Sequence, residues 1–186
     1  RILGPRDFGI VGIGLLTISV LEVFSNPGFT AALVQKDTDE TRDSLNTAWT
    51  FTLIRCLLLM VLMLIFAPLI ADFFDRPASM WIIRGIAVSY LFQGFTNISI
   101  IYFQKNIEFN KQFFFIASGA LTDFVVAVAA GLIMRSPWAL VFGYVAGYIV
   151  RMVYSYIAYP LRPAFELEWP KVKSLMHFGR WVFASN

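Results

Sequence analysis

Four charged side chains, Glu22, Arg55, Asp123 and Arg151, stand inside long apolar runs of this 186-residue sequence. If those runs lie in a lipid bilayer, an isolated charge costs about 2.5–3.5 kcal/mol on insertion scales. Such residues are retained where they line a polar cavity or where they neutralise one another as ion pairs. The candidate chemistry of the chain is therefore at these four positions, and both interpretations are open.

The order of the four charges predicts two ion pairs. If consecutive apolar runs form antiparallel helices, Asp123 and Arg151 each lie roughly 12–15 Å from the same membrane face, at about 1.5 Å per residue. Glu22 and Arg55 differ in depth by about 6 Å, which an arginine side chain can cover. We therefore predict that Glu22 pairs with Arg55 and that Asp123 pairs with Arg151.

In three of the apolar runs, small and polar residues recur every four positions, so the members of each row share one face of their helix. The three rows are Gly119, Asp123, Ala127 and Gly131; Gly143, Gly147, Arg151 and Ser155; and Gly85, Ser89, Gln93 and Asn97. Small residues in membrane helices favour close contact between helices. The row that contains Gln93 and Asn97 either hydrogen-bonds a neighbouring helix or lines a hydrophilic path.

The elements that must position these residues are transmembrane helices. Hydrophobic residues make up 58% of the sequence and charged residues 15%, which is atypical of a soluble domain. A span needs roughly 20 mostly apolar helical residues. Five segments meet that need: 8–34, 47–71, 80–103, 113–134 and 138–159. Their continuous apolar runs lack the alternation of a membrane β-barrel, so the predicted fold class is an all-α polytopic membrane protein, a helical bundle.

The remaining segments complete this prediction. Pro27 predicts a kink or break in the first span. Residues 160–178 are expected to form a cytoplasmic interfacial linker with Val172 toward the membrane surface, and 179–186 to start a further span. All five lysines flank loops on one side, which the positive-inside rule assigns to the cytoplasm. That orientation predicts an odd number of further spans upstream if the true N-terminus is cytoplasmic, and one such span would suffice.

Several classes of site are not indicated by the sequence. Cys56 is the single cysteine, so no disulfide framework or cysteine-ligated metal is expected. We find no nucleotide-binding loop, metal-ligand spacing or hydrolase motif. The net charge of +3 is attributed to loops that face membrane lipids rather than to nucleic acid. We therefore predict no cofactor, no metal, no nucleic-acid partner and no enzyme.

A family resemblance covers most of the chain. It is carried, in order, by LGPRDFG from residue 3, GFTAALVQK from 28, FQK from 103 with Phe109, WALV from 138 with Gly143 and Gly147, and RP from 162 with FGRW from 178. In this order and spacing, the chain resembles the Wzx-type polysaccharide flippases of the MOP exporter superfamily. The resemblance implies two helical bundles around a central cavity, with this chain as a fragment of one half.

The resemblance implies a transport function. Its implied substrate is an undecaprenyl-pyrophosphate-linked oligosaccharide, moved across the bacterial inner membrane for surface polysaccharide biosynthesis, with other polysaccharide assembly proteins as partners. Arg55 and Arg151 are then candidate diphosphate ligands, because the planar guanidinium binds phosphate oxygens. Gln93 and Asn97 are further substrate-binding candidates. Glu22 and Asp123 are candidates for ion coupling or for the ion pairs.

Three other functions are open at the level of sequence. A cation-coupled multidrug exporter of the same superfamily would favour an acidic cavity without unpaired arginines. A membrane glycosyltransferase or polymerase of the same pathway should carry a large external loop, whereas the longest outward connection here is 72–78. A non-transporting scaffold would use the buried charges only to set helix register.

Overall fold

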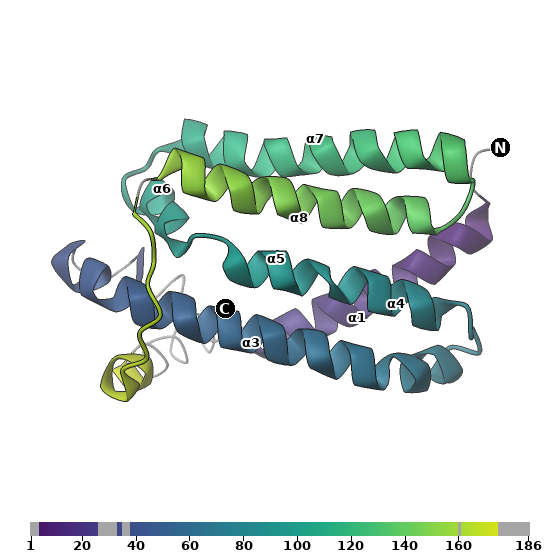
Figure 1. Cartoon of the computed structure of the whole chain (residues 1–186), viewed down its shortest axis with the longest axis horizontal. Coiled ribbons are helices and arrows are strands. Elements are labelled where there is room, and N and C mark those ends of the chain that lie inside the picture. Colours follow the sequence, from purple (N-terminus) through teal and green to yellow (C-terminus); the bar gives the residue numbers. More distant parts are fainter. Residues whose placement is uncertain (1–3, 26–32, 35–37, 160, 175–186) are drawn as a thin grey trace.

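The computed structural model describes residues 4–25, 33–34, 38–159 and 161–174 (Figure 1). Its helices are α1 (Pro5–Ser25), α3 (Thr38–Phe73), α4 (Ser79–Ala87), α5 (Ser89–Phe95), the 3-10 helix η1 (Ile98–Ile100), α6 (Ile101–Lys105), α7 (Phe109–Met134) and α8 (Trp138–Ala158). No strand occurs among the described residues, and the predicted all-α fold class is confirmed. The predicted break at Pro27 and the predicted start of a span at 179–186 lie outside the described residues.

Several helices are long and apolar enough to cross a membrane. Within the described ranges these are Ser44–Phe73, Phe109–Met134 and Trp138–Ala158, and the bent pair Ser79–Phe95 with Ile98–Lys105 makes a fourth if it counts as one span. The predicted span 8–34 is described only in part, by α1 and residues 33–34. A count of five spans therefore stays a prediction.

The span predicted over 80–103 is bent. The axis turns by 72° between Ser79–Phe95 and Ile98–Lys105. At the bend, Asn97 has an extended backbone (ψ 116°) and its side chain caps η1. The Asn97 N–H donates to Ser155 Oγ at 2.9 Å, which ties the bend to α8. The bend is therefore held by a cap and a tertiary hydrogen bond, with no proline in this segment to cause it.

Helices α7 and α8 form a closely packed antiparallel hairpin (Figure 1). A Cβ placed on Gly143 would lie 2.6 Å from the carbonyl oxygen of Asp123 and 2.7 Å from Ala127 Cβ. A Cβ on Gly147 would lie 2.8 Å from the carbonyl oxygen of Gly119. The small-residue rows predicted on α7 and α8 thus face each other, because small residues let the two helix backbones approach.

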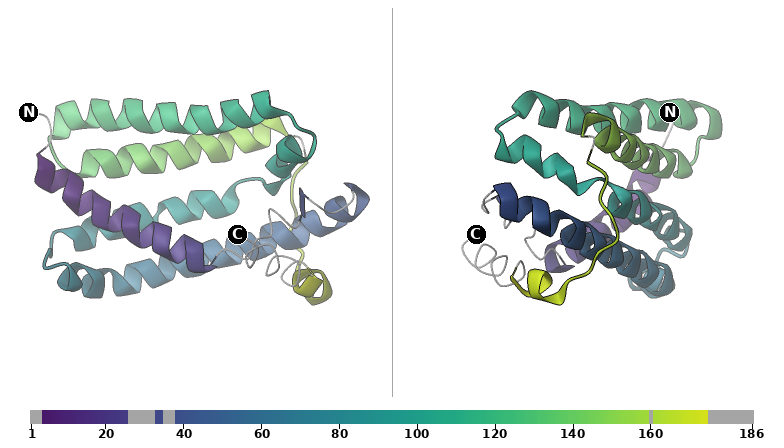
Figure 2. Two further views of the ribbon diagram at one scale, coloured as in Figure 1. Left: turned by 180° about the vertical axis from the view of Figure 1, so that it is seen from behind. Right: turned by 60° about the vertical axis from the view of Figure 1, so that its left-hand side comes forward.

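The other helices pack around a buried apolar cluster. Figure 2 shows α1 crossing the bundle obliquely, and it packs mainly against α4. The cluster includes Val11, Ile18, Cys56, Leu59, Met63, Ile82, Ile83, Ile86, Tyr90 and Val141. In contrast, α7 exposes large apolar side chains such as Leu121, Phe124 and Ile133. An apolar outer surface of this kind suits lipid contact.

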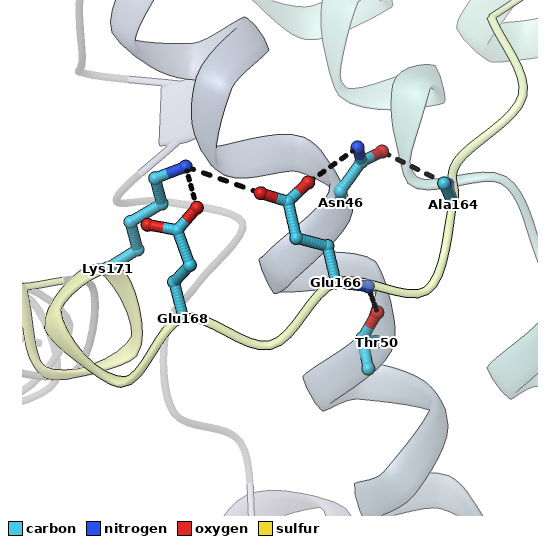
Figure 3. Close-up of polar contacts among 6 residues, drawn as sticks. All are labelled: Asn46, Thr50, Ala164, Glu166, Glu168 and Lys171. Atoms are coloured by element: carbon cyan, nitrogen blue, oxygen red, sulfur yellow. Dashed lines mark hydrogen bonds and ion pairs between the residues drawn. The ribbon is translucent and has the colours of Figure 1, made fainter.

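After α8, residues 161–168 form an extended segment, here called the strap, that crosses α3 (Figures 1 and 3). At its start, Asn97 Nδ2 donates to the Leu161 carbonyl oxygen at 2.6 Å. Farther along, the Phe165 ring lies against Trp49 of α3, with centroids 5.0 Å apart. The strap therefore joins the bend, the end of α8 and the first part of α3.

Residues 169–174 are helical and lead away from the strap. Val172 in this segment was predicted to face the membrane surface, yet it is only 1% exposed. It belongs to a buried cluster with Leu33, Leu45, Ala48, Ile101 and Tyr102. This part of the linker packs against protein because α3 and α6 offer it an apolar surface.

A polar network fastens the strap to α3 (Figure 3). Asn46 uses both atoms of its amide: Oδ1 accepts from the Ala164 N–H at 3.1 Å, and Nδ2 donates to Glu166 Oε2 at 2.9 Å. The Glu166 N–H donates to Thr50 Oγ1 at 3.0 Å, and Lys171 Nζ lies 3.7 Å from Glu166 Oε1. The hydrogen bond from Asn46 lowers the pKa of the Glu166 carboxyl, so its stabilising contribution is present at neutral pH and weakens as acid protonates that group.

Replacing Asn46 by alanine is expected to loosen the strap. The Ala164 N–H loses its acceptor, and one hydrogen bond contributes about 0.5–1.5 kcal/mol, so amide exchange there should rise about two- to tenfold. Hydrogen–deuterium exchange of peptides covering 161–168 measures the change. The control is Asn106→Ala, at an exposed amide in the turn after α6. Unchanged exchange in the Asn46→Ala variant would contradict the described network.

Candidate functional site

A cavity of about 410 Å³ lies between α3, the bent span, α7 and α8. Its polar lining consists of Thr52, Arg55, Gln93, Thr96, Asn97, Gln104, Gln112 and Arg151. Its aromatic lining consists of Trp49, Phe103, Phe115 and Tyr148. Among the described residues, no aspartate or glutamate lines this cavity. The charged groups on its described lining are therefore the two arginines.

The structure brings the four predicted substrate-binding residues to this one cavity. Arg55 comes from α3, Gln93 from α5, Asn97 from the bend and Arg151 from α8. Both arginines and Gln93 are partly exposed, whereas Asn97 is fully buried. The Asn97 side chain is already engaged with Ser99 and Leu161, so it holds the wall of the cavity in place.

Neither predicted ion pair forms in the part of the chain that the structure describes. The Glu22 carboxylate instead accepts a hydrogen bond from Gln93 Nε2 at 3.1 Å, and Arg55 Nη1 donates to Ser25 Oγ at 3.4 Å. Glu22 and Arg55 therefore lie in the same region of the bundle, as their predicted depths along the helices indicated. The rotation of each helix about its axis, however, places an uncharged hydrogen-bond partner beside each of them: Gln93 beside Glu22 and Ser25 beside Arg55.

The second predicted pair is replaced by reciprocal packing between α7 and α8. The Arg151 side chain lies directly over Gly119, where any Cβ would overlap it. Asp123 lies against Gly143, whose added Cβ would come within 2.7 Å of Asp123 Oδ1. The Arg151 guanidinium lies over the Tyr148 ring, with Cζ 5.4 Å from its centroid. Each charge therefore sits on a glycine of the opposite helix.

Three of the residues that line the cavity each carry a buried donor with no hydrogen-bond partner among the described residues. The donors are Arg55 Nε, Arg151 Nε and Trp49 Nε1. A buried donor without an acceptor costs about 1–3 kcal/mol. All three groups donate and cannot accept, so the cavity is suited to a ligand that is rich in acceptor oxygens. Within the described ranges, His, Cys, Asp and Glu form no group of three that could hold a metal.

The lining residues that the sequence did not predict include Trp49, Gln104 and Gln112. A signal existed for Gln112, because it lies seven residues before Gly119 and so extends the small-residue row by two turns. Gln104 follows the bend, where four-residue spacing no longer reports a common face. Trp49 resembles an ordinary aromatic at a span end, yet it is only 4% exposed.

Comparisons with known proteins agree on one family. Residues 1–186 match the family described as polysaccharide biosynthesis protein. The chain is 22% identical over 186 residues to the succinoglycan biosynthesis transport protein ExoT of Rhizobium meliloti, covering 100% of the chain and 37% of that protein. It is 21% identical over 188 residues to the lipopolysaccharide biosynthesis protein WzxC of Escherichia coli, covering 100% of the chain and 38% of that protein.

A third relative is similar over a shorter region. The teichuronic acid biosynthesis protein TuaB of Bacillus subtilis is 27% identical over 168 residues, which cover 89% of the chain and 34% of that protein. The chain thus spans about a third of the length of these curated relatives. No solved structure matches it significantly.

Proposed function

Because this chain belongs to the polysaccharide biosynthesis protein family, we propose that the complete protein moves an undecaprenyl-diphosphate-linked oligosaccharide across the bacterial inner membrane. The observation that carries the proposal is the cavity, which is lined by Arg55, Arg151 and Trp49, each with an unpartnered donor, and by no carboxylate among the described residues. A diphosphate offers the acceptors that such a wall lacks. Membrane lipids and other polysaccharide assembly proteins are the partners that this function implies.

In this proposal, Arg55 and Arg151 bind the diphosphate from two sides of the cavity. Their guanidinium groups come from α3 and α8, which are separate elements. A planar guanidinium presents a fork of donors to phosphate oxygens. Gln93 adds an amide to the same wall, while Asn97 positions the bend. The cationic lining gives no support to a drug exporter that uses an acidic cavity.

Glu22 and Asp123 are proposed to couple transport to an ion. Neither carboxylate forms an ion pair with a described residue, and Glu22 contacts the cavity wall through Gln93. Protonation of Glu22 would change the hydrogen bond that orients Gln93. Glu22→Gln with Asp123→Asn is therefore expected to lower export and flatten its pH dependence, measured by substrate transport into vesicles. An unchanged export rate would contradict ion coupling at these residues.

The proposed function is tested by deleting the complete gene. Undecaprenyl-linked oligosaccharide should accumulate in the membrane with its sugars on the cytoplasmic side, and surface polysaccharide should be lost. Extraction of lipid-linked sugars and their sensitivity to enzymes added outside spheroplasts measure both effects. Restoration by the wild-type gene is the control. Intact surface polysaccharide without accumulation would overturn the proposal.

A further inference from the structure

We propose that one end of the cavity is a subsite for uncharged sugar hydroxyls, formed by Trp49, Gln104 and Gln112. This end is called the α6 end, because α6 and the beginnings of α3 and α7 meet there (Figure 1). The inference rests on the proposed function, since it assigns to this end the sugar next to the diphosphate. It adds residues that would select the substrate.

The cavity has two levels along the helix axes. On α3, Trp49 precedes Arg55 by six residues, which is about 9 Å at 1.5 Å per residue. On α7, Gln112 precedes Gly119 by seven residues, about 10 Å, and Gly119 is the residue that underlies Arg151. Both displacements point toward the α6 end, because α3 and α7 run in the same direction (Figure 1).

The chemistry of the two levels differs. The arginine level supplies donors only, which suits phosphate oxygens. At the α6 end, the amides of Gln104 and Gln112 both donate and accept, as a sugar hydroxyl does. Trp49, Gln104 and Gln112 carry no charge, so they are matched to hydroxyl groups rather than to a second ionic group. The cavity therefore has one end for an anion and one for a neutral polar group.

Trp49 supplies an independent sign of a ligand at this level. The side chain is 4% exposed and lines the cavity, and its Nε1 has no hydrogen-bond partner among the described residues. Its ring is held in place by Phe165 of the strap, at 5.0 Å between centroids. A fixed aromatic ring with a free donor loses little conformational entropy on binding. Its N–H requires an acceptor, and a sugar hydroxyl can provide one.

The test measures the affinity of the complete protein, reconstituted in lipid nanodiscs, for defined probes. The probes are farnesyl diphosphate and the same diphosphate carrying one glucose, galactose or N-acetylglucosamine. At least one glycosylated probe should bind the wild type more tightly than farnesyl diphosphate does. Gln104→Ala combined with Gln112→Ala should reduce that advantage about tenfold, while the Kd for farnesyl diphosphate changes less than about twofold.

Two single variants sharpen the result. Trp49→Phe retains the ring and removes the N–H, so it should reduce the same advantage about fivefold. Asn110→Ala is the control: it removes an exposed amide on α7 that does not line the cavity, and it should leave all Kd values unchanged. Thermal midpoints of all variants show whether each remains folded.

The outcomes separate the subsite from the proposed function. Tighter binding of a glycosylated probe, weakened by the glutamine variants and not by Asn110→Ala, supports the subsite. Equal affinity for bare and glycosylated probes, or an advantage that survives the glutamine variants, overturns the subsite and leaves diphosphate binding intact. Failure of the wild type to bind farnesyl diphosphate or its glycosylated forms overturns both.

Discussion

Replacing Arg151 by glutamine is expected to lower export of lipid-linked oligosaccharide by at least about tenfold. Removing one partner of a buried, charge-assisted contact costs about 2–5 kcal/mol, and 1.4 kcal/mol already corresponds to about tenfold. Arg151→Lys should give an intermediate rate, because lysine keeps the charge but lacks the planar fork. Transport into vesicles and surface polysaccharide in cells measure the effect.

Two further variants distinguish binding from packing at this position. Arg151 lies over Gly119, so its loss could act through the α7–α8 contact. Arg55→Gln is independent of that contact, because Arg55 lies on α3, and it should reduce export similarly. Arg84→Gln is the matched control: Arg84 on α4 lies over Trp81 at 5.0 Å, and it does not line the cavity. Normal export by Arg55→Gln and Arg151→Gln would exclude the two guanidinium groups from substrate binding.

Adding a single methyl group at Gly143 is expected to separate α7 from α8. The Cβ of Gly143→Ala would meet the Asp123 carbonyl oxygen at 2.6 Å, and a backbone atom cannot rotate away. Overpacking of this kind costs about 1–3 kcal/mol. The folded yield and the thermal midpoint of the detergent-solubilised protein should both fall. Export should fall with them, because Arg151 depends on this interface.

The control for this prediction is Gly12→Ala on α1. A Cβ at Gly12 meets no described atom within 4 Å. Alanine is favoured over glycine inside a helix by about 1 kcal/mol, so this variant should be neutral or slightly stabilising. Equal thermal midpoints for the Gly12 and Gly143 variants would show that the two helices are not in the close contact described above.

The class of the protein was predictable because membrane helices leave a local signal. Long apolar runs interrupted by few charges specify transmembrane helices without any reference to tertiary contacts. The family resemblance, which rests on short strings in a fixed order, is confirmed by the match over residues 1–186. The facing glycine rows of α7 and α8 were also predictable, since four-residue spacing defines a helix face and the short connection 135–137 makes the two helices neighbours.

Contacts between distant segments were decided by the tertiary structure. Gln93 reaches Glu22 across 71 positions, and Arg55 reaches Ser25 across 30, so Arg55 lacks the acidic partner that helix depth alone suggested. Asn46 binds the strap across 118 and 120 positions, which no local pattern announces.

The sequence by itself determined the helices, their apolar surfaces and the faces that carry polar residues, because these follow from composition and a fixed helical period. The tertiary structure alone decided the bend at Asn97, the course of the strap and the shared cavity of Arg55 and Arg151. Those features depend on the rotation of each helix about its axis and on hydrogen bonds between distant segments. A hydrophobic pattern is nearly uniform around such helices, so it determines neither the rotation of each helix nor the hydrogen bonds between distant segments.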